Sequence, residues 1–352
     1  MHELEIDIST GQLNNIIIEN KEKFHQEKNH ILAVGLEVSD YIHVDDTGAR
    51  HKGKNGYCTL IGSETFSWFE STESKSRINF LKMLRAGHCD YLLNIDAVSY
   101  MMLNKLPQHV LKSIIANTGM LFADDTQWND FLADNGIVKD HHIRIATEGA
   151  LIGSIIEHGI SKRLVIVSDD AGQFNVLLHA LCWIHMERTI DKIIAFTDES
   201  KKDLDDVKEQ IWNLYKELKL YKENPNTKDK VRLDSMFDDI FTRKTHCATL
   251  NEALKRIYNN KFELLLVLER PEIPLHNNSS ENDIREYVKK RKISGSTRSD
   301  SGRCCRDTFT SLKKTCRKLG VSFWQYLKDR INKMGLIPDL SDLVRQQALN
   351  PG

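Results

Sequence analysis

Residues 164–170 read Leu164-Val-Ile-Val-Ser-Asp-Asp170, an apolar run that ends in two acids. Such a run is typical of a strand that is buried on both faces of a sheet. Helices are expected on both sides of it, from Glu148 to His158 and from Phe174 to Thr189. The pattern favours a central strand packed between helices, with an acid at its end.

Upstream of this run, three short segments have the composition of strands. They are Tyr41–Thr47, Gly56–Ile61 and Phe66–Glu70, each rich in β-branched or aromatic residues. Gly62 and Ser63 form a turn signal between the last two. We expect an antiparallel meander here, preceded by a helix over residues 9–36 and followed by an amphipathic helix over residues 74–86.

Downstream, residues 201–256 are charged and helical in pattern. Leu204, Val207, Ile211, Leu214 and Leu218 recur at intervals of three and four, which predicts one long amphipathic helix. Apolar residues 264–268 predict a further strand. A helix is expected from Asn278, and helical patterning continues to about Met334 before a polar tail.

The sequence as a whole predicts an α/β fold, a mixed sheet flanked by helices and interrupted by helical insertions. The expected parts are an N-terminal helical segment (1–40), a sheet domain (41–195 and 262–335) with an insertion (88–145), a second helical insertion (196–261) and a C-terminal tail (336–352). No internal repeat or low-complexity tract is evident.

Composition limits the possible classes of protein. The chain has 352 residues and a formal net charge of -1, so any nucleic-acid surface must come from local clustering of basic residues. Its seven cysteines include no C-x-x-C pair, which argues against a disulfide framework or a zinc ribbon. No run approaches the about 20 apolar residues that span a bilayer. We expect a cytoplasmic protein without a membrane partner.

Three acids are placed where rigid elements could hold them. Asp45 closes the first strand, Asp169 closes the buried strand, and Glu281 lies one turn into a helix. Carboxylates on such mounts suit two magnesium ions about 4 Å apart that act on a phosphodiester. Each acid also has an ordinary structural interpretation, as a turn residue, a helix N-cap and part of a capping box from Asn278 to Glu281.

Four motifs occur in order along the chain. They are Val44-Asp-Asp-Thr-Gly48; Ser168-Asp-Asp-Ala-Gly-Gln-Phe174; Cys182-Trp-Ile-His185 with Arg188; and Glu269-Arg-Pro-Glu-Ile-Pro-Leu-His-Asn-Asn-Ser-Ser-Glu281, followed by Arg285 and Arg291-Lys292. The set resembles the catalytic, C-terminal part of the insertion-sequence sixty-six family of DDE transposases.

The resemblance implies a ribonuclease H-like fold and DNA strand cleavage and transfer at Asp45, Asp169 and Glu281 with two magnesium or manganese ions. Asp169 is preferred to Asp170 because it follows the strand directly. It also implies transposon-end and target DNA as partners, a homo-oligomer on DNA, possible accessory transposition proteins, and a bacterial cytoplasm with nucleoid association when bound.

Two positions depart from the family pattern. Asp46 stands where the family usually has Glu, and His276 where it often has Asp. The family also commonly has an upstream zinc ribbon for end binding, and this sequence has no cysteine pair for one. Two alternatives therefore stay open: a catalytically inactive or truncated remnant that binds DNA, and a ribonuclease H-like nuclease or resolvase.

A DNA-binding surface is expected after Glu281. The stretch from Arg285 to Lys318 contains twelve Lys or Arg residues and only three acids, Glu286, Asp300 and Asp307. Basic residues of this kind bind phosphates, although a solvated helix face is the alternative. Trp183 is expected in the core, and His185 either has a structural partner or contacts the scissile phosphate. The candidate DNA-binding residues are Arg285, Lys289, Lys290, Arg291, Lys292, Arg298, His185 and Arg188.

Overall fold

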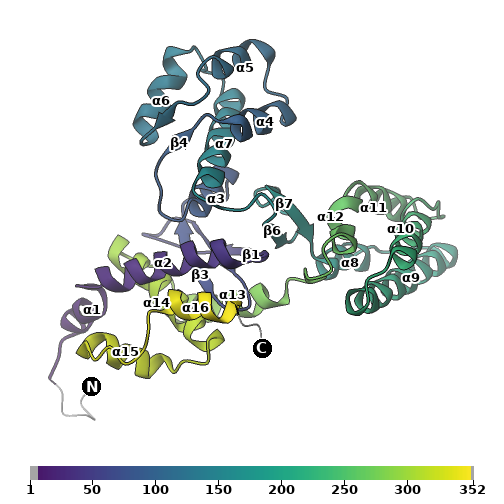
Figure 1. The fold of residues 1–352 in the computed structure, drawn as a ribbon. Coiled ribbons are helices and arrows are strands. Elements are labelled where there is room, and N and C mark those ends of the chain that lie inside the picture. The colour runs from purple at the N-terminus through teal and green to yellow at the C-terminus, as the bar shows by residue number, and fades with distance from the viewer. Residues whose placement is uncertain (1–6, 350–352) are drawn as a thin grey trace. The chain divides into compact units, whose positions relative to one another are not determined.

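The computed structural model describes residues 7–349 (Figure 1). The outer ends of the predicted N-terminal segment and C-terminal tail lie outside these residues. The chain divides into two compact units. Unit 1 comprises Met1–Ser39, Asp45–Lys162 and Asn282–Gly352, and unit 2 comprises Asp40–Val44 and Arg163–Glu281. The domain division expected from the sequence stays a prediction.

A five-stranded mixed sheet has the strand order β3-β2-β1-β6-β7. The strands are β1 (Tyr41–Gly48), β2 (Tyr57–Gly62), β3 (Ser67–Thr72), β6 (Val165–Ser168) and β7 (Leu178–Leu181). Strands β1, β6 and β7 run parallel to one another, whereas β2 and β3 pair antiparallel with each other. Helices flank the sheet, which confirms the predicted α/β, ribonuclease H-like class.

Strand β6 accounts for the apolar run that precedes Asp169 in the sequence. All four of its residues are buried. It pairs with β1 on one side and with β7 on the other, so it has no free edge among the described strands. A strand in this position needs apolar side chains on both faces. Its carboxyl end delivers Asp169 to the end of the sheet.

Strands β2 and β3 form the predicted hairpin, with Ile61 opposite Trp68. The hairpin turns tightly after Gly62, where an added Cβ would lie 2.8 Å from the carbonyl oxygen of Phe66. Only glycine fits such a close approach. The turn signal at Gly62 and Ser63 therefore has a steric cause.

The open edge of β3 is covered by helix α14 (Asp300–Lys318) of the same unit. Side chains of α14 accept hydrogen bonds from alternate backbone N–H groups of β3. Asp307 accepts from Ser71 at 2.8 Å, Ser311 from Phe69 at 2.9 Å, and Thr315 from Ser67 at 3.1 Å. Four helical residues rise about 6 Å and two strand residues about 6.8 Å, so the two series stay in step. The helix thus replaces a missing strand partner.

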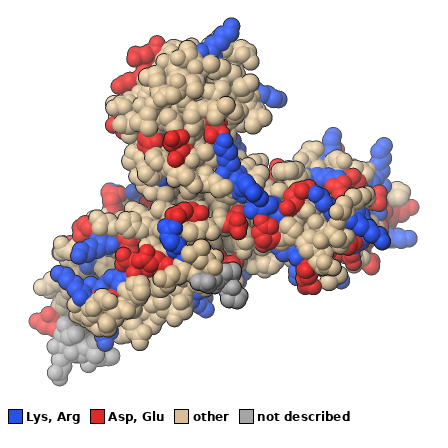
Figure 2. Space-filling view, viewed as in Figure 1, with Lys and Arg blue, Asp and Glu red and all other residues tan. Residues whose placement is uncertain are grey.

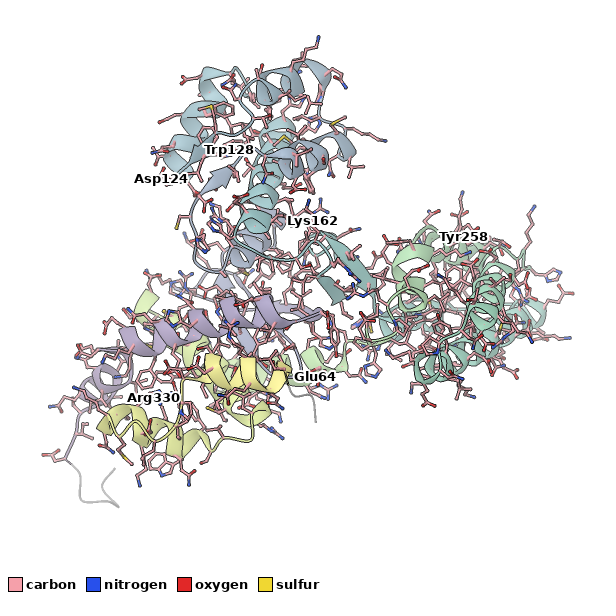
Figure 3. All side chains as sticks on the ribbon, viewed as in Figure 1. Glu64, Asp124, Trp128, Lys162, Tyr258 and Arg330 are labelled. Carbon is pink, nitrogen blue, oxygen red and sulfur yellow. The ribbon has the colours of Figure 1, made fainter. Side chains whose placement is uncertain are left out.

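The segment 88–145 had no predicted structure, and it forms most of a helical excursion in unit 1. Its elements are β4 (Tyr91–Leu92), α4 (Ile95–Leu103), α5 (Gln108–Ile115), β5 (Leu121–Phe122), α6 (Asp125–Asp134) and the start of α7 (Asp140–Glu157). Trp128, labelled in Figure 3, is buried at its centre. It stacks on Tyr91 and donates to Thr147 at 2.9 Å. The excursion begins after α3 (Arg77–Leu84), which is the predicted amphipathic helix.

Unit 2 has a helical core of its own around β6 and β7. Its helices are α8 (Trp183–Asp191), α9 (Asp198–Glu223), α10 (Thr227–Phe241), α11 (Ala248–Asn259), α12 (Lys261–Leu265) and the short 3-10 helix η2 (Leu266–Leu268). The five predicted apolar positions of α9 are all buried in this core. The predicted helical character of residues 201–256 is confirmed.

Two predicted elements in unit 2 are wrong. Residues 264–268 are helical rather than extended, and all five side chains are buried in the helical core. Residues 174–189 are not one helix, because Leu178–Leu181 form β7 before α8 begins. Short apolar runs fit a buried strand and a buried helix equally well, so periodicity could not separate them.

The N-terminal and C-terminal helices of the described chain both belong to unit 1. The helix predicted over residues 9–36 is two helices, α1 (Thr10–Ile18) and α2 (Glu22–Val38), separated near Asn20, which has a positive φ. The predicted polar tail contains α16 (Leu340–Leu349), which packs on α2. Arg330 of α15 (Phe323–Asn332), labelled in Figure 3, donates to both carboxylate oxygens of Glu27. Among residues 7–349, no helix has the length and apolar character needed to cross a bilayer.

Candidate active site

Asp169 lies directly after β6 and is partly buried. Its Oδ1 accepts the N–H of Ala171 at 3.2 Å, and its carbonyl oxygen accepts the hydroxyl of Ser168 at 2.6 Å. The neighbouring Asp170 is exposed. Burial, and then the charge of Asp169, raise the pKa of Asp170. The carboxylate of Asp170 is also hydrogen-bonded to the side chain of Asn260.

Glu281 lies in the first turn of α13 (Asn278–Ser294), as the sequence predicts. Its Oε1 is 3.2 Å from Nη1 of Arg188 and 3.5 Å from Nε2 of His185. Both partners come from α8, one turn apart. The carboxylate is thus held by one fixed positive charge and one imidazole. His185 and Arg188, from the third sequence motif, thus lie beside the last of the three acids.

The start of α8 is fastened to the segment that leads into Glu281. Trp183 is buried, donates its backbone N–H to Leu275 at 2.9 Å and its indole N–H to Leu264 at 2.9 Å. The Sγ of Cys182 accepts the N–H of Asn277 at 3.2 Å. Burial raises the pKa of the Cys182 thiol, which keeps it neutral. The core position expected for Trp183 is confirmed.

Asn277 has a role that the sequence motif did not reveal. It is buried, its Oδ1 lies 2.8 Å from Nδ1 of His43, and its Nδ2 donates to the carbonyl of Val44 at 2.8 Å. Because α13 begins at Asn278, the predicted capping box from Asn278 to Glu281 starts one residue too late. The side chain before the helix is instead used to tie it to β1.

A cavity of about 440 Å³ in unit 2 joins several of these residues. Asp169, Asp170, Cys182 and His185 line it together with Arg256 and Asn260 from the end of α11. His185 thus contacts both the cavity and Glu281. Arg256 and Asn260 carry no recognisable motif, so sequence reasoning could not have found them.

Asp45 belongs to unit 1, near the end of β1, and is partly buried. The N–H of Asp46 donates to its Oδ1 at 2.7 Å. Asp46 itself forms an ion pair with Lys75. The carboxylates of Asp45, Asp169 and Glu281 are not among the groups of three potential metal ligands whose atoms lie within 4.8 Å of one another in the described residues.

The candidate DNA-binding residues differ in exposure. Lys289, Lys292, Arg298, Arg285 and Arg188 are exposed, and His185 is partly buried. Two further residues are engaged within unit 1. Lys290 donates to Thr310 at 3.2 Å, and burial lowers its pKa. Arg291 donates to Thr47 at 3.1 Å and to the carbonyl of Gly48.

Comparison with known proteins agrees with the arrangement of these motifs. Residues 154–304 match the family model described as Transposase IS66 family. The chain is also 43% identical over 321 residues to a protein of Sinorhizobium fredii (strain NBRC 101917 / NGR234) named "Uncharacterized protein y4jO", an alignment that covers 90% of this chain and 100% of the relative. The chain therefore belongs to the family of that relative and, through the domain at residues 154–304, to the IS66 transposase family.

Proposed function

We propose that the protein is a DDE transposase that cuts and joins DNA strands at Asp45, Asp169 and Glu281. The observation that carries the proposal is the cavity in unit 2, which Asp169 lines together with His185, the residue that contacts Glu281. The family match over residues 154–304 includes both acids of this unit.

The strand register supports including Asp45. His43 of β1 pairs with Val167 of the parallel strand β6. Asp45, in β1, and Asp169, directly after β6, each come two residues after this pair, so both side chains follow the same alternation from a paired position. These strand ends are the rigid mounts that the chemistry requires.

The donor set fits magnesium or manganese. All three side chains offer carboxylate oxygens, the hard ligands that Mg²⁺ prefers. When bound, two such ions activate an oxygen nucleophile and stabilise the leaving oxygen of a phosphodiester. The positive charge of Arg188 beside Glu281 marks a place where the carboxylate already attracts cations. Binding an ion there requires Glu281 to exchange this partner.

Arg188 and His185 would then be available for DNA. A guanidinium released from a carboxylate is suited to grip a phosphate with two parallel hydrogen bonds. Arg256, which lines the same cavity, adds a second positive charge beside Asp170. Outside the cavity, exposed Lys289, Lys292, Arg298 and Arg285 would hold the DNA backbone without regard to sequence.

The test is metal-dependent nicking of supercoiled plasmid by the purified full chain with Mn²⁺ or Mg²⁺. Asp45→Asn, Asp169→Asn and Glu281→Gln keep the shape of each side chain and remove its charge, so each should reduce nicking to background. Asp205→Asn, at an exposed position of α9, is the matched control and should behave as the wild type.

Asp170→Asn distinguishes the two neighbouring acids and should retain more activity than Asp169→Asn. The assignment of Asp169 would be overturned if their effects were reversed. Wild-type nicking by Glu281→Gln or Asp45→Asn, in protein whose circular dichroism is unchanged, would exclude the DDE site as a whole.

A further inference from the structure

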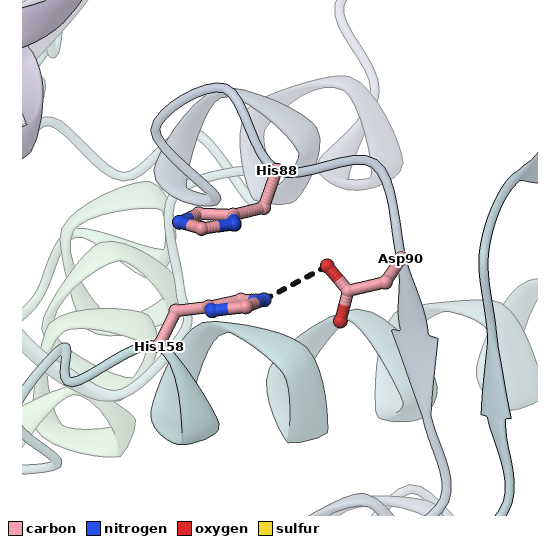
Figure 4. A group of neighbouring side chains, drawn as sticks. All are labelled: His88, Asp90 and His158. Atoms are coloured by element: carbon pink, nitrogen blue, oxygen red, sulfur yellow. Dashed lines mark hydrogen bonds and ion pairs between the residues drawn. The ribbon is translucent and has the colours of Figure 1, made fainter.

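A second group of potential metal ligands lies in unit 1, outside the candidate active site. His88, Asp90 and His158 offer ligand atoms that all lie within 4.8 Å of one another. The imidazole rings of His88 and His158 are stacked, with centroids 3.5 Å apart and planes inclined by 10°. Figure 4 shows the Asp90 carboxylate at the edge of the His158 ring, where Nε2 of His158 lies 2.8 Å from Oδ1 of Asp90.

The group has unused coordinating capacity. The second carboxylate oxygen of Asp90, Oδ2, is buried and makes no hydrogen bond of good geometry among the described residues. The hydroxyl of Ser154 interacts with this carboxylate but also lacks a hydrogen bond of good geometry. Buried polar atoms without a partner are costly, and a bound ion or its water would satisfy them.

The donor atoms also suit a metal. Two imidazole nitrogens and one carboxylate oxygen form a ligand set for borderline divalent ions such as Zn²⁺, with water in the remaining position.

The position of the three residues suggests what an ion would do. His88 and Asp90 lie where the chain enters the helical excursion of α4–α7, and His158 is the C-cap of α7, where the excursion ends. The two sides are 68 residues apart in sequence. The negative end of the α7 dipole, at His158, favours a cation. A link between these points would close the excursion at its base.

We propose that His88, Asp90 and His158 bind a divalent transition-metal ion of the Zn²⁺ class, which fastens the two ends of the α4–α7 excursion together. An ion that binds the folded state and not the unfolded one stabilises the folded state. The site is separate in position and in ligand chemistry from the carboxylates proposed for magnesium, and the inference does not depend on the proposed function.

The test is titration calorimetry of ZnCl₂ into the chelator-treated full chain, in buffer containing excess Mg²⁺ to occupy carboxylate sites. The wild type should bind one Zn²⁺ with a raised melting temperature, and Co²⁺ in its place should give visible absorption bands. His88→Gln and His158→Gln should each weaken Zn²⁺ binding by more than about a hundredfold, beyond the usual effect of altering an outer-shell residue. Both variants should lose the zinc-dependent rise in melting temperature.

The matched control is the double variant His109→Gln/His141→Gln. These residues belong to another histidine group of the same excursion, around His142, with ring centroids 5.9 and 4.6 Å from it. The control should bind zinc as the wild type does. If His158→Gln fails to fold, His88→Gln decides alone, because it leaves the pair of Asp90 and His158 intact. Unchanged zinc affinity in His88→Gln, or loss of binding in the control, would overturn the proposal.

Discussion

Asp307 is a deeply buried carboxyl group in unit 1. Only 1% of the residue is exposed. It accepts hydrogen bonds from the N–H and hydroxyl of Ser71 at 2.8 and 3.0 Å and from the hydroxyl of Tyr287 at 3.2 Å. Burial nevertheless dominates and raises its pKa from 3.8 to about 6. The folded protein therefore holds a proton here that the unfolded chain releases at lower pH.

This shift predicts a specific pH dependence of stability. Between about pH 4 and pH 6 the folded state binds more protons at Asp307 than the unfolded state, so stability falls as pH rises through this window. Relative to Asp307→Asn, the wild type should lose as much as about 3 kcal/mol of unfolding free energy between pH 4 and pH 7. Urea unfolding at both pH values measures it. An equal difference between the two proteins at pH 4 and pH 7 would contradict the prediction.

At the scale of single residues, the sequence revealed the charged members of the candidate site better than their supports. Asp169, Glu281, His185 and Arg188 were recognisable from motifs and spacing. The role of Asn277 was not, because an asparagine before a helix normally predicts a cap and gives no sign of a partner in β1. Such partners are set by the fold, and a single sequence does not state them.

At the scale of elements, strand predictions succeeded where local signals were strong. β1, β2, β3 and β6 combine β-branched residues with turns or acids at their ends. β7 was missed because Leu178–Leu181 is a short apolar run that continues into α8. Whether such a run is extended depends on its neighbour β6, a contact distant in sequence. The short elements of residues 88–145 were not predicted for a related reason, since they are stabilised by one another around Trp128.

The cover of β3 by α14 can be tested at the same scale. Ser311→Ala/Thr315→Val removes two hydroxyl acceptors and leaves the N–H groups of Phe69 and Ser67 buried without those partners. Each loss should cost about 1–3 kcal/mol of unfolding free energy. Urea unfolding measures the cost, and light scattering should detect association through the uncovered strand edge.

The control for this variant is Ser301→Ala, an exposed position on the same helix. It should change stability by less than about 0.5 kcal/mol. If the double variant were as stable as this control, the hydroxyl groups would not be what satisfies the edge of β3. A loss of helix α14 as a whole would instead lower the circular dichroism of the folded protein.

At the scale of the whole molecule, charge is balanced in total but not in distribution. The formal net charge is -1, and on the face shown in Figure 2 acidic and basic side chains are intermingled over α9–α11. The excess of basic residues lies instead between Arg285 and Lys318. DNA affinity that arises from this region should therefore depend on a few named residues and not on the total charge.

Salt dependence measures how many of them contact phosphate. Each neutralised phosphate releases condensed counterions, so the logarithm of the binding constant falls with the logarithm of salt concentration by about 0.9 per contact. Lys289→Glu/Lys292→Glu replaces two exposed lysines and should reduce this slope by about 2, for all DNA sequences alike. Lys202→Glu/Lys216→Glu changes the charge equally at exposed positions of α9 and should leave the slope unchanged. Fluorescence anisotropy with a labelled duplex at several salt concentrations gives both slopes. Equal reductions in the two variants would show that DNA affinity depends only on the total charge. No reduction in either variant would place this basic stretch away from DNA.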